Sequence, residues 1–126
     1  MLKSGFDIIE PEKIELAEQM WIFHNAEIVV GELSSGLHNT IFSPPGTIVV
    51  QLNPFNSVQR NIALSRGHIL VSVVPDDGKV RFWPESPGLS PDFLVSPDAV
   101  ERAIAAGLEQ RQRRSGLLAD LPGAPP

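Results

Sequence analysis

The chain of 126 residues contains no cysteine. This absence excludes disulfides, zinc–thiolate sites and a thiol nucleophile, and it suits a reducing compartment. No apolar run approaches the roughly 20 residues that a membrane-spanning helix needs. The opening residues, MLKSGFDIIEPE, carry acids where a signal peptide has its apolar core. We therefore expect a cytoplasmic protein without a membrane span.

Positive charge is also scarce, since the formal net charge is −5. An acidic chain is a poor partner for nucleic acid or an anionic membrane, and neither is expected here. The basic cluster Arg111, Arg113 and Arg114 falls near the end of a predicted helix. Cations there stabilise the helix dipole, which is the role we predict for these arginines.

The chain has three histidines, and their spacing does not fit a metal site. His24, His38 and His68 lack the i, i+4 or short-loop spacing of metal ligands, so no bound metal is predicted. His24 lies beside the apolar face of a predicted helix and His68 begins a predicted strand, so both are expected to be packed or interfacial. Only His38 falls within the candidate site described below.

Strand and helix patterns alternate along the chain, and the strands are continuous apolar runs. Such runs are typical of a parallel sheet that is covered on both faces. The fold class predicted is therefore α/β, a Rossmann-like three-layer domain with a mainly parallel sheet of about four or five strands. We expect residues 1–114 to form a single domain and residues 115–126 to form a flexible tail with proline and glycine.

The expected elements follow from local signals. Pro11 begins a helix whose apolar face comprises Ile14, Ala17, Met20, Trp21 and either Phe23 or His24. Three further helices are predicted: a short one through Phe42 with Ser34 and Ser35 as caps, one with Ser57 as its cap and Gly67 after its end, and one with Ser96 as its cap and Pro97 first. The predicted strands are Phe6–Ile9, EIVVG ending at Gly31, Thr47–Leu52 and His68–Val74, with shorter extended pieces at VRFW (80–83) and FLV (93–95).

The turn after Val30 is the candidate binding site, because ligands of open α/β sheets lie beyond the carboxyl ends of strands. Gly31 lets the backbone turn, Ser34 and Ser35 offer hydroxyls, and Gly36 lets a ligand approach. The N–H groups that begin the following short helix would form an anion cradle. The alternative is a plain strand-to-helix connection capped by serine, since the Gly-x-Gly-x-x-Gly spacing is absent.

The stretch AEIVVGELSSGLHNTIFSPPGTIVVQLNP, residues 26–54, resembles the signature region of glycosyltransferase family 61. That family includes capsular-polysaccharide-type and plant xylan-type transferases. The resemblance extends upstream over GFDIIEPEKIELAEQMWIFHNA and downstream over NIALSRGHILVSV and VSPDAVERAI. The residues at matching spacing are Gly31, Gly36, Leu37, Asn39, Phe42, Pro44, Pro45 and Gly46.

The resemblance implies a two-domain GT-B architecture with a nucleotide-sugar donor in the cleft between the domains. This chain resembles the C-terminal, donor-side half of such an enzyme. A nucleoside diphosphate or nucleotide sugar is then the implied ligand, and no further cofactor is expected. The implied phosphate-binding residues are Gly31, Ser34, Ser35, Gly36, Leu37, His38 and Asn39, and the implied ribose-side residues are Gln51 and Asn53.

Four positions depart from the family pattern. Leu33 stands where the family has a histidine, Ser34 replaces a glycine, His38 replaces a threonine and Gln51 replaces a glutamate. A leucine cannot donate a proton. An amide also binds ribose hydroxyls more weakly than a carboxylate, by roughly 1–2 kcal/mol. We therefore expect a degenerate donor-binding domain that is not catalytic alone.

The alternative function is a non-catalytic α/β interaction or dimerisation module, which Leu33 and Gln51 favour. An isolated half of a two-domain fold would expose the apolar surface that faced its other half. A homodimer or a separate partner chain would cover that surface. The aromatic residues Phe82, Trp83 and Phe93, set among prolines, either cover a core edge or add to this surface.

Overall fold

The computed structural model describes residues 6–32, 36–80 and 94–119. Its strands form a parallel sheet in the order β1-β2-β3. The elements in chain order are η1 (Pro11–Lys13), α1 (Leu16–Asn25), β1 (Ile28–Glu32), η2 (Leu37–Phe42), β2 (Ile48–Leu52), α2 (Val58–Arg66), β3 (Ile69–Val73) and α3 (Pro97–Ala119).

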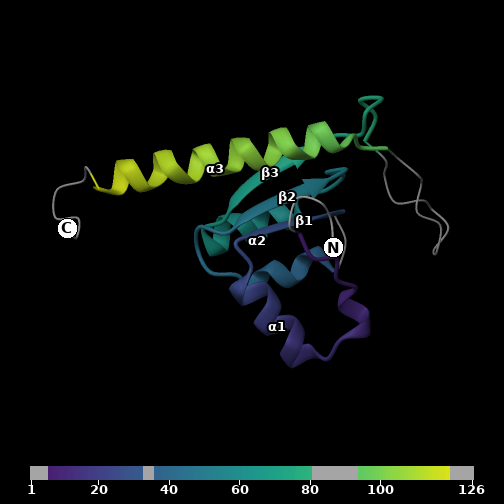
Figure 1. Ribbon diagram of the computed structural model, residues 1–126, viewed down its shortest axis with the longest axis vertical. Coiled ribbons are helices and arrows are strands. Elements are labelled where there is room, and N and C mark those ends of the chain that lie inside the picture. Colours follow the sequence, from purple (N-terminus) through teal and green to yellow (C-terminus); the bar gives the residue numbers. More distant parts are fainter. Residues whose placement is uncertain (1–5, 33–35, 81–93, 120–126) are drawn as a thin grey trace.

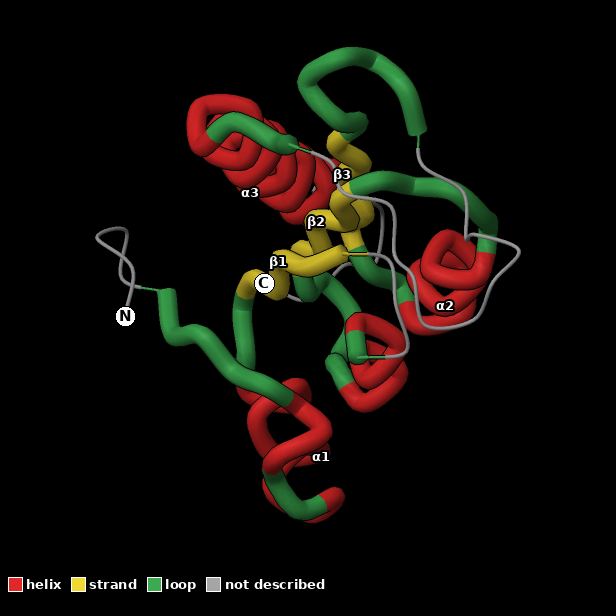
Figure 2. The backbone as a smooth tube through the Cα atoms, turned by 90° about the vertical axis from the view of Figure 1, so that its right-hand side faces the viewer, coloured by secondary structure: helices red, strands yellow, loops and turns green. Residues whose placement is uncertain are grey.

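The elements are arranged in three layers (Figure 1, Figure 2). Helix α3 covers one face of the sheet, where it packs against β2 and β3. The short helix η2 and helix α2 cover the other face, and α1 continues this layer by packing against η2. The predicted fold class, a Rossmann-like α/β domain with a parallel sheet, is confirmed.

The core lies between the sheet and α3. Ile48 and Val50 of the central strand are fully buried there, and Ile69, Val73 and Ala103 complete the cluster. β2 is flanked by a strand on each side and by a helical layer on each face. This position explains why its sequence is a continuous apolar run from Ile48 to Val50.

Gly107 sets how closely α3 approaches the sheet. A Cβ atom at this position would lie 2.6 Å from Ile48 Cγ2, well inside van der Waals contact. The missing side chain therefore allows the helix backbone to rest directly on the central strand. Ala103 lies one turn earlier in α3 and is also buried against the cluster.

Three arginines of α3 serve a different purpose from the one predicted. The helix continues past them to Ala119, so they do not occupy its last turn. Arg111 forms an ion pair with Glu27, and Arg113 forms one with Glu109. Arg114 Nη1 donates a hydrogen bond to the Gly67 carbonyl oxygen at 2.8 Å. Arg111 and Arg114 thereby hold α3 against the amino-terminal edge of the sheet.

The N-terminal part of the chain differs from its prediction. Residues 6–10 adopt no regular secondary structure, although the sequence predicts a strand at Phe6–Ile9. Pro11 begins a single 3-10 turn, and the α-helix starts only at Leu16. Of the apolar face predicted for this helix, only Phe23 is buried, and Trp21 is 68% exposed. The described chain places no strand over this end of α1, so the predicted face has little to pack against.

The predicted helix ends are mostly confirmed. Gly67 adopts the left-handed conformation after α2, with φ of 76°, and Ser96 Oγ accepts a hydrogen bond from the Ala99 N–H at 3.3 Å. Ser57 makes no side-chain capping bond, and Asn56 Oδ1 instead accepts the Val58 N–H at 3.0 Å. The asparagine side chain is placed better because it reaches two residues forward.

The remaining differences concern the later part of the chain. Helix α3 continues five residues into the segment that the sequence predicts as tail, from 115 to Ala119. The extended pieces predicted at 80–83 and 93–95 fall largely outside the described residues, as do Phe82, Trp83 and Phe93. Their described members, Val80, Leu94 and Val95, are not in strands.

The substitution Gly107→Ala tests the contact between α3 and β2. The added methyl group would overlap Ile48, and we expect a loss of about 1–3 kcal/mol in the free energy of unfolding. Gly116→Ala is the matched control, because nothing lies within 4 Å of that position in the same helix. Its replacement should raise stability by up to about 1 kcal/mol through helix propensity. Equal urea midpoints for the two variants would contradict the close packing.

Candidate functional site

Three residues in register lie side by side near the carboxyl ends of the described strands, and two of them are polar. The register aligns Gly31 of β1 with Gln51 of β2, and Gln51 with Ser72 of β3. Neighbours in register share a face of the sheet, and Leu37 of η2 packs at 3.4 Å from where a Gly31 Cβ would lie. The row therefore faces η2 and α2, on the side of the sheet opposite α3.

Gln51 is the most informative residue of this row. Its side chain is only 4% exposed, and its Nε2 donates a hydrogen bond to Ser72 Oγ at 2.6 Å. Its Oε1 is buried and has no hydrogen-bond partner among the described residues. A buried acceptor without a donor costs about 1–3 kcal/mol. The oxygen is thus suited to accept a hydrogen bond from a hydroxyl group that enters the site.

Asn53 directly follows this strand and has a constrained backbone. Its φ of 58° lies in the left-handed region, where asparagine is among the few residues tolerated. Its N–H donates to the Val73 carbonyl oxygen at 2.9 Å, and the side chain is buried. The two residues predicted on the ribose side, Gln51 and Asn53, therefore both lie at the carboxyl end of β2.

Asn39 holds two structural elements together. Its Nδ2 donates a hydrogen bond to Gln19 Oε1 at 3.0 Å, and Gln19 Nε2 donates to the Ile14 carbonyl oxygen at 2.9 Å. This chain of bonds ties η2 to α1 and to the turn before it. Asn39 was singled out as a phosphate ligand, but the structure gives its side chain a structural partner.

The short helix after β1 offers a limited anion site. It is a 3-10 helix of six residues, and its cap position is occupied by Gly36, which has no side chain to cap it. A helix of this length carries only a small dipole. His38 is half-buried, and its Nε2 is buried without a partner. Ser34 and Ser35, the predicted hydroxyl ligands, lie outside the described residues.

A buried polar network beneath η2 escaped the sequence analysis. Gln59 Nε2 donates to Thr40 Oγ1 at 2.6 Å, and both side chains are fully buried. Ser43 Oγ donates to the Phe23 carbonyl oxygen at 2.7 Å. His68 Nε2 hydrogen-bonds with the Ser43 carbonyl oxygen at 3.0 Å. In the sequence, Gln59 is the residue that could have indicated this network. It lies four residues before Ala63 and therefore shares the buried face of the helix.

This network also settles where two histidines lie. His68 is buried, as predicted. His24 is exposed, although its Nδ1 lies 3.3 Å from the Phe42 carbonyl oxygen. Both histidines are bonded to η2 or to the residue that ends it, so they help to position this helix over the sheet.

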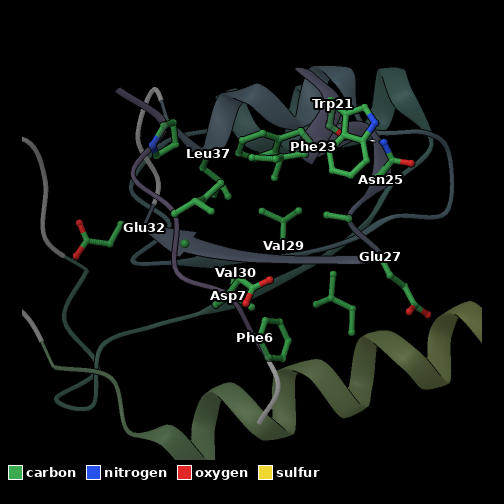
Figure 3. A pocket seen from close by; sticks show the side chains of 17 residues that line it. Phe6, Asp7, Trp21, Phe23, Asn25, Glu27, Val29, Val30, Glu32 and Leu37 are labelled. Carbon is green, nitrogen blue, oxygen red and sulfur yellow. Dashed lines mark hydrogen bonds between the residues drawn. The ribbon is translucent and has the colours of Figure 1, made fainter. Parts of the chain in front are cut away.

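A cavity of about 700 Å³ runs beside β1. Figure 3 shows Trp21 and Phe23 on one side of the strand and Phe6 on the other. Of the candidate ligand residues, Gly31, Gly36 and Leu37 line this cavity, whereas His38, Asn39, Gln51 and Asn53 do not. The structure therefore divides the predicted site between the cavity and the carboxyl edge of the sheet.

The described residues contain neither a cluster of metal-ligating side chains nor a helix suited to a membrane. No group of three histidine, aspartate or glutamate side chains in this part of the chain could hold a metal ion. None of the described helices has the length and apolarity that would let it cross a membrane.

The double-mutant cycle of Gln19→Ala and Asn39→Ala tests the structural role of Asn39. Because the two side chains share one hydrogen bond, each substitution should lower the free energy of unfolding by about 0.5–1.5 kcal/mol. The double variant should lose less than the sum of the single losses. Strictly additive losses in urea unfolding would show that Asn39 does not depend on Gln19.

Comparison with known proteins gives one match. Residues 1–50 match the family model described as Glycosyltransferase 61. No curated protein and no solved structure matches the chain. The matched segment runs from the N-terminus through η2 to Val50, and it ends directly before Gln51. Over its first 50 residues this chain thus matches the glycosyltransferase family 61 model, and the resemblance is confirmed for that segment.

Proposed function

We propose that this chain is a glycosyltransferase-like domain that binds the nucleoside diphosphate of a nucleotide-sugar donor at the carboxyl edge of the sheet. The observation that carries the proposal is the buried Oε1 of Gln51, which no described residue partners. A polar atom in this state is stabilised when a ligand supplies a donor. The family match over residues 1–50 supports the ligand class.

The pairing of Gln51 with Ser72 supports a sugar hydroxyl as the group that is bound. The Gln51 amide N–H is used by Ser72 Oγ, which leaves the Ser72 hydroxyl proton free to donate and Gln51 Oε1 free to accept. One donor and one acceptor on adjacent strands suit the two neighbouring hydroxyls of a ribose. The exposed Ser72 side chain gives access from solvent.

We further propose that the domain does not transfer sugar on its own. Neither the amide of Gln51 nor the side chain of Asn39, which is bonded to Gln19, can act as a general acid or base. The donor would be held here, and catalytic groups would come from another domain or chain. A cytoplasmic location is part of the same proposal, supported by the lack of cysteine.

The second candidate function is an interaction module, and an exposed apolar surface on α1 favours it. The helix leaves Leu16, Met20 and Trp21 exposed to 62%, 42% and 68%. Large apolar groups gathered on one helix are typical of a surface that binds protein. A homodimer or a separate partner chain would cover them.

A thermal-unfolding panel tests donor binding. The chain is heated with millimolar UDP, GDP, CMP, ADP and their sugar conjugates. A ligand at a hundred times its Kd adds about 2.7 kcal/mol, which should raise Tm by several degrees in a domain of this size. We expect one nucleotide to do so.

Two glutamine variants complete the experiment. Gln51→Ala should remove most of the nucleotide-dependent shift, whereas Gln112→Ala, on the exposed side of α3, should retain it. A flat panel with every nucleotide would refute donor binding. A flat panel together with a concentration-dependent dimer in gel filtration would favour the interaction module.

A further inference from the structure

The outer edge of β1 is open in the described chain. The Glu27 carbonyl oxygen accepts the Ile48 N–H, so residues 27, 29 and 31 direct their backbone groups toward β2. The N–H and C=O groups of Ile28, Val30 and Glu32 therefore point away from the sheet. No described strand pairs with them.

The side chains of β1 indicate that this edge is built to be covered. Ile28 and Val30 pack against the core cluster on the α3 side, while Val29 points toward α1 (Figure 3). A strand that is apolar on both faces is typical of the interior of a parallel sheet. An exposed edge strand usually carries charged side chains or proline instead.

The cavity lies next to the outer edge of β1, where one further strand of the sheet would pair with it. β1 forms one wall, and α1 contributes Trp21 and Phe23 to the floor. Phe6, Asp7 and Ile9 also line this cavity, and Phe6 lies across β1 from Trp21 and Phe23 (Figure 3). The segment that precedes α1 therefore lines the same cavity as the open edge of β1.

The topology favours the same segment as the occupant. The connections from β1 to β2 and from β2 to β3 lie on one face of the sheet, and each moves one strand in the same direction. Helix α1 belongs to that layer (Figure 2). A strand before α1, joined to β1 by a right-handed crossover through α1, would lie parallel to β1 on its outer edge.

The sequence of the segment suits this place. Phe-Asp-Ile-Ile is rich in residues that favour strands. Phe6 lies on the α3 side of β1 (Figure 3), so Ile8 would point to the same side in an extended chain. In the structure Ile8 is 69% exposed and does not line the cavity.

We propose that residues Phe6–Ile9 form a strap that seats on the outer edge of β1 as a fourth, parallel strand and closes the cavity. The seated strap pairs with the outward backbone groups of Val30 and Glu32 and buries Ile8. It also closes the space beside Gly31, Gly36 and Leu37, so that the carboxyl edge at Gln51 is left as the open site. The strap thereby controls access to one half of the divided candidate site.

Amide hydrogen exchange of the intact chain tests the strap. The seated strap predicts that the Val30 amide exchanges at least a hundredfold more slowly than an unstructured amide. Ile8→Asp should raise that rate at least tenfold, because it places a charge on the face that the strap buries, and Ile8→Val should not. Ile41→Asp is the matched control on η2, where the isoleucine is 51% exposed and distant in sequence from the strap. It should leave the Val30 rate unchanged.

Other outcomes would overturn the proposal. If the strap does not seat, Ile8→Asp should leave the exchange rate of the Val30 amide unchanged, because Ile8 is then exposed to solvent. A fast Val30 amide in the unmodified chain would likewise show an open edge. Protection of Val30 that grows with protein concentration, together with a dimer mass in light scattering, would assign the edge to a second copy of the chain. The Val49 amide, which faces β3, reports global unfolding in every variant.

Discussion

The contact between Ile48 and Gly107 determines how this small domain is assembled. Ile48 lies at the start of the central strand, and Gly107 lies in the middle of α3, the helix that covers one face of the sheet. Because the glycine has no side chain, the helix backbone rests directly on the strand. The distance between these layers then sets how Val50, Ile69, Val73 and Ala103 interlock. Arg111 and Arg114 secure the same helix one to two turns further along, at the same amino-terminal end of the strands.

The two faces of the sheet are stabilised by different means. The face toward α3 is an apolar core whose stability comes from removing side chains from water. The face toward η2 and α2 contains the buried polar side chains Thr40, Gln51 and Gln59, which are held by hydrogen bonds. Hydrogen bonds are directional, so this second face can hold polar groups at set positions, as a binding site requires. The Gln51–Ser72 part of the candidate site lies on this face.

The family resemblance and the structure agree on the fold. The structure, however, places the predicted site residues in two separate regions. Gly31, Gly36 and Leu37 gather around the cavity beside β1, whereas Gln51 and Asn53 lie at the carboxyl end of β2. Asn39, which a family pattern would assign to a ligand, is bonded to Gln19 and positions η2. A residue that matches the family pattern can thus have a structural role in the fold. Its presence alone does not indicate that a ligand is bound.

The sequence by itself determined the local and periodic features of this protein. Continuous apolar runs identified the three strands that the described residues form, and the parallel, covered character of their sheet. Gly67, Ser96 and Pro97 marked helix ends, because capping depends on neighbouring residues only. Only the tertiary structure decided which side chains are partnered across the fold. The Gln59–Thr40 and Gln51–Ser72 bonds join residues far apart in the chain. The exposure of Trp21 likewise depends on what covers α1, and no local pattern carries that information. Burial and long-range pairing are properties of packed layers, which form only when the whole chain has folded.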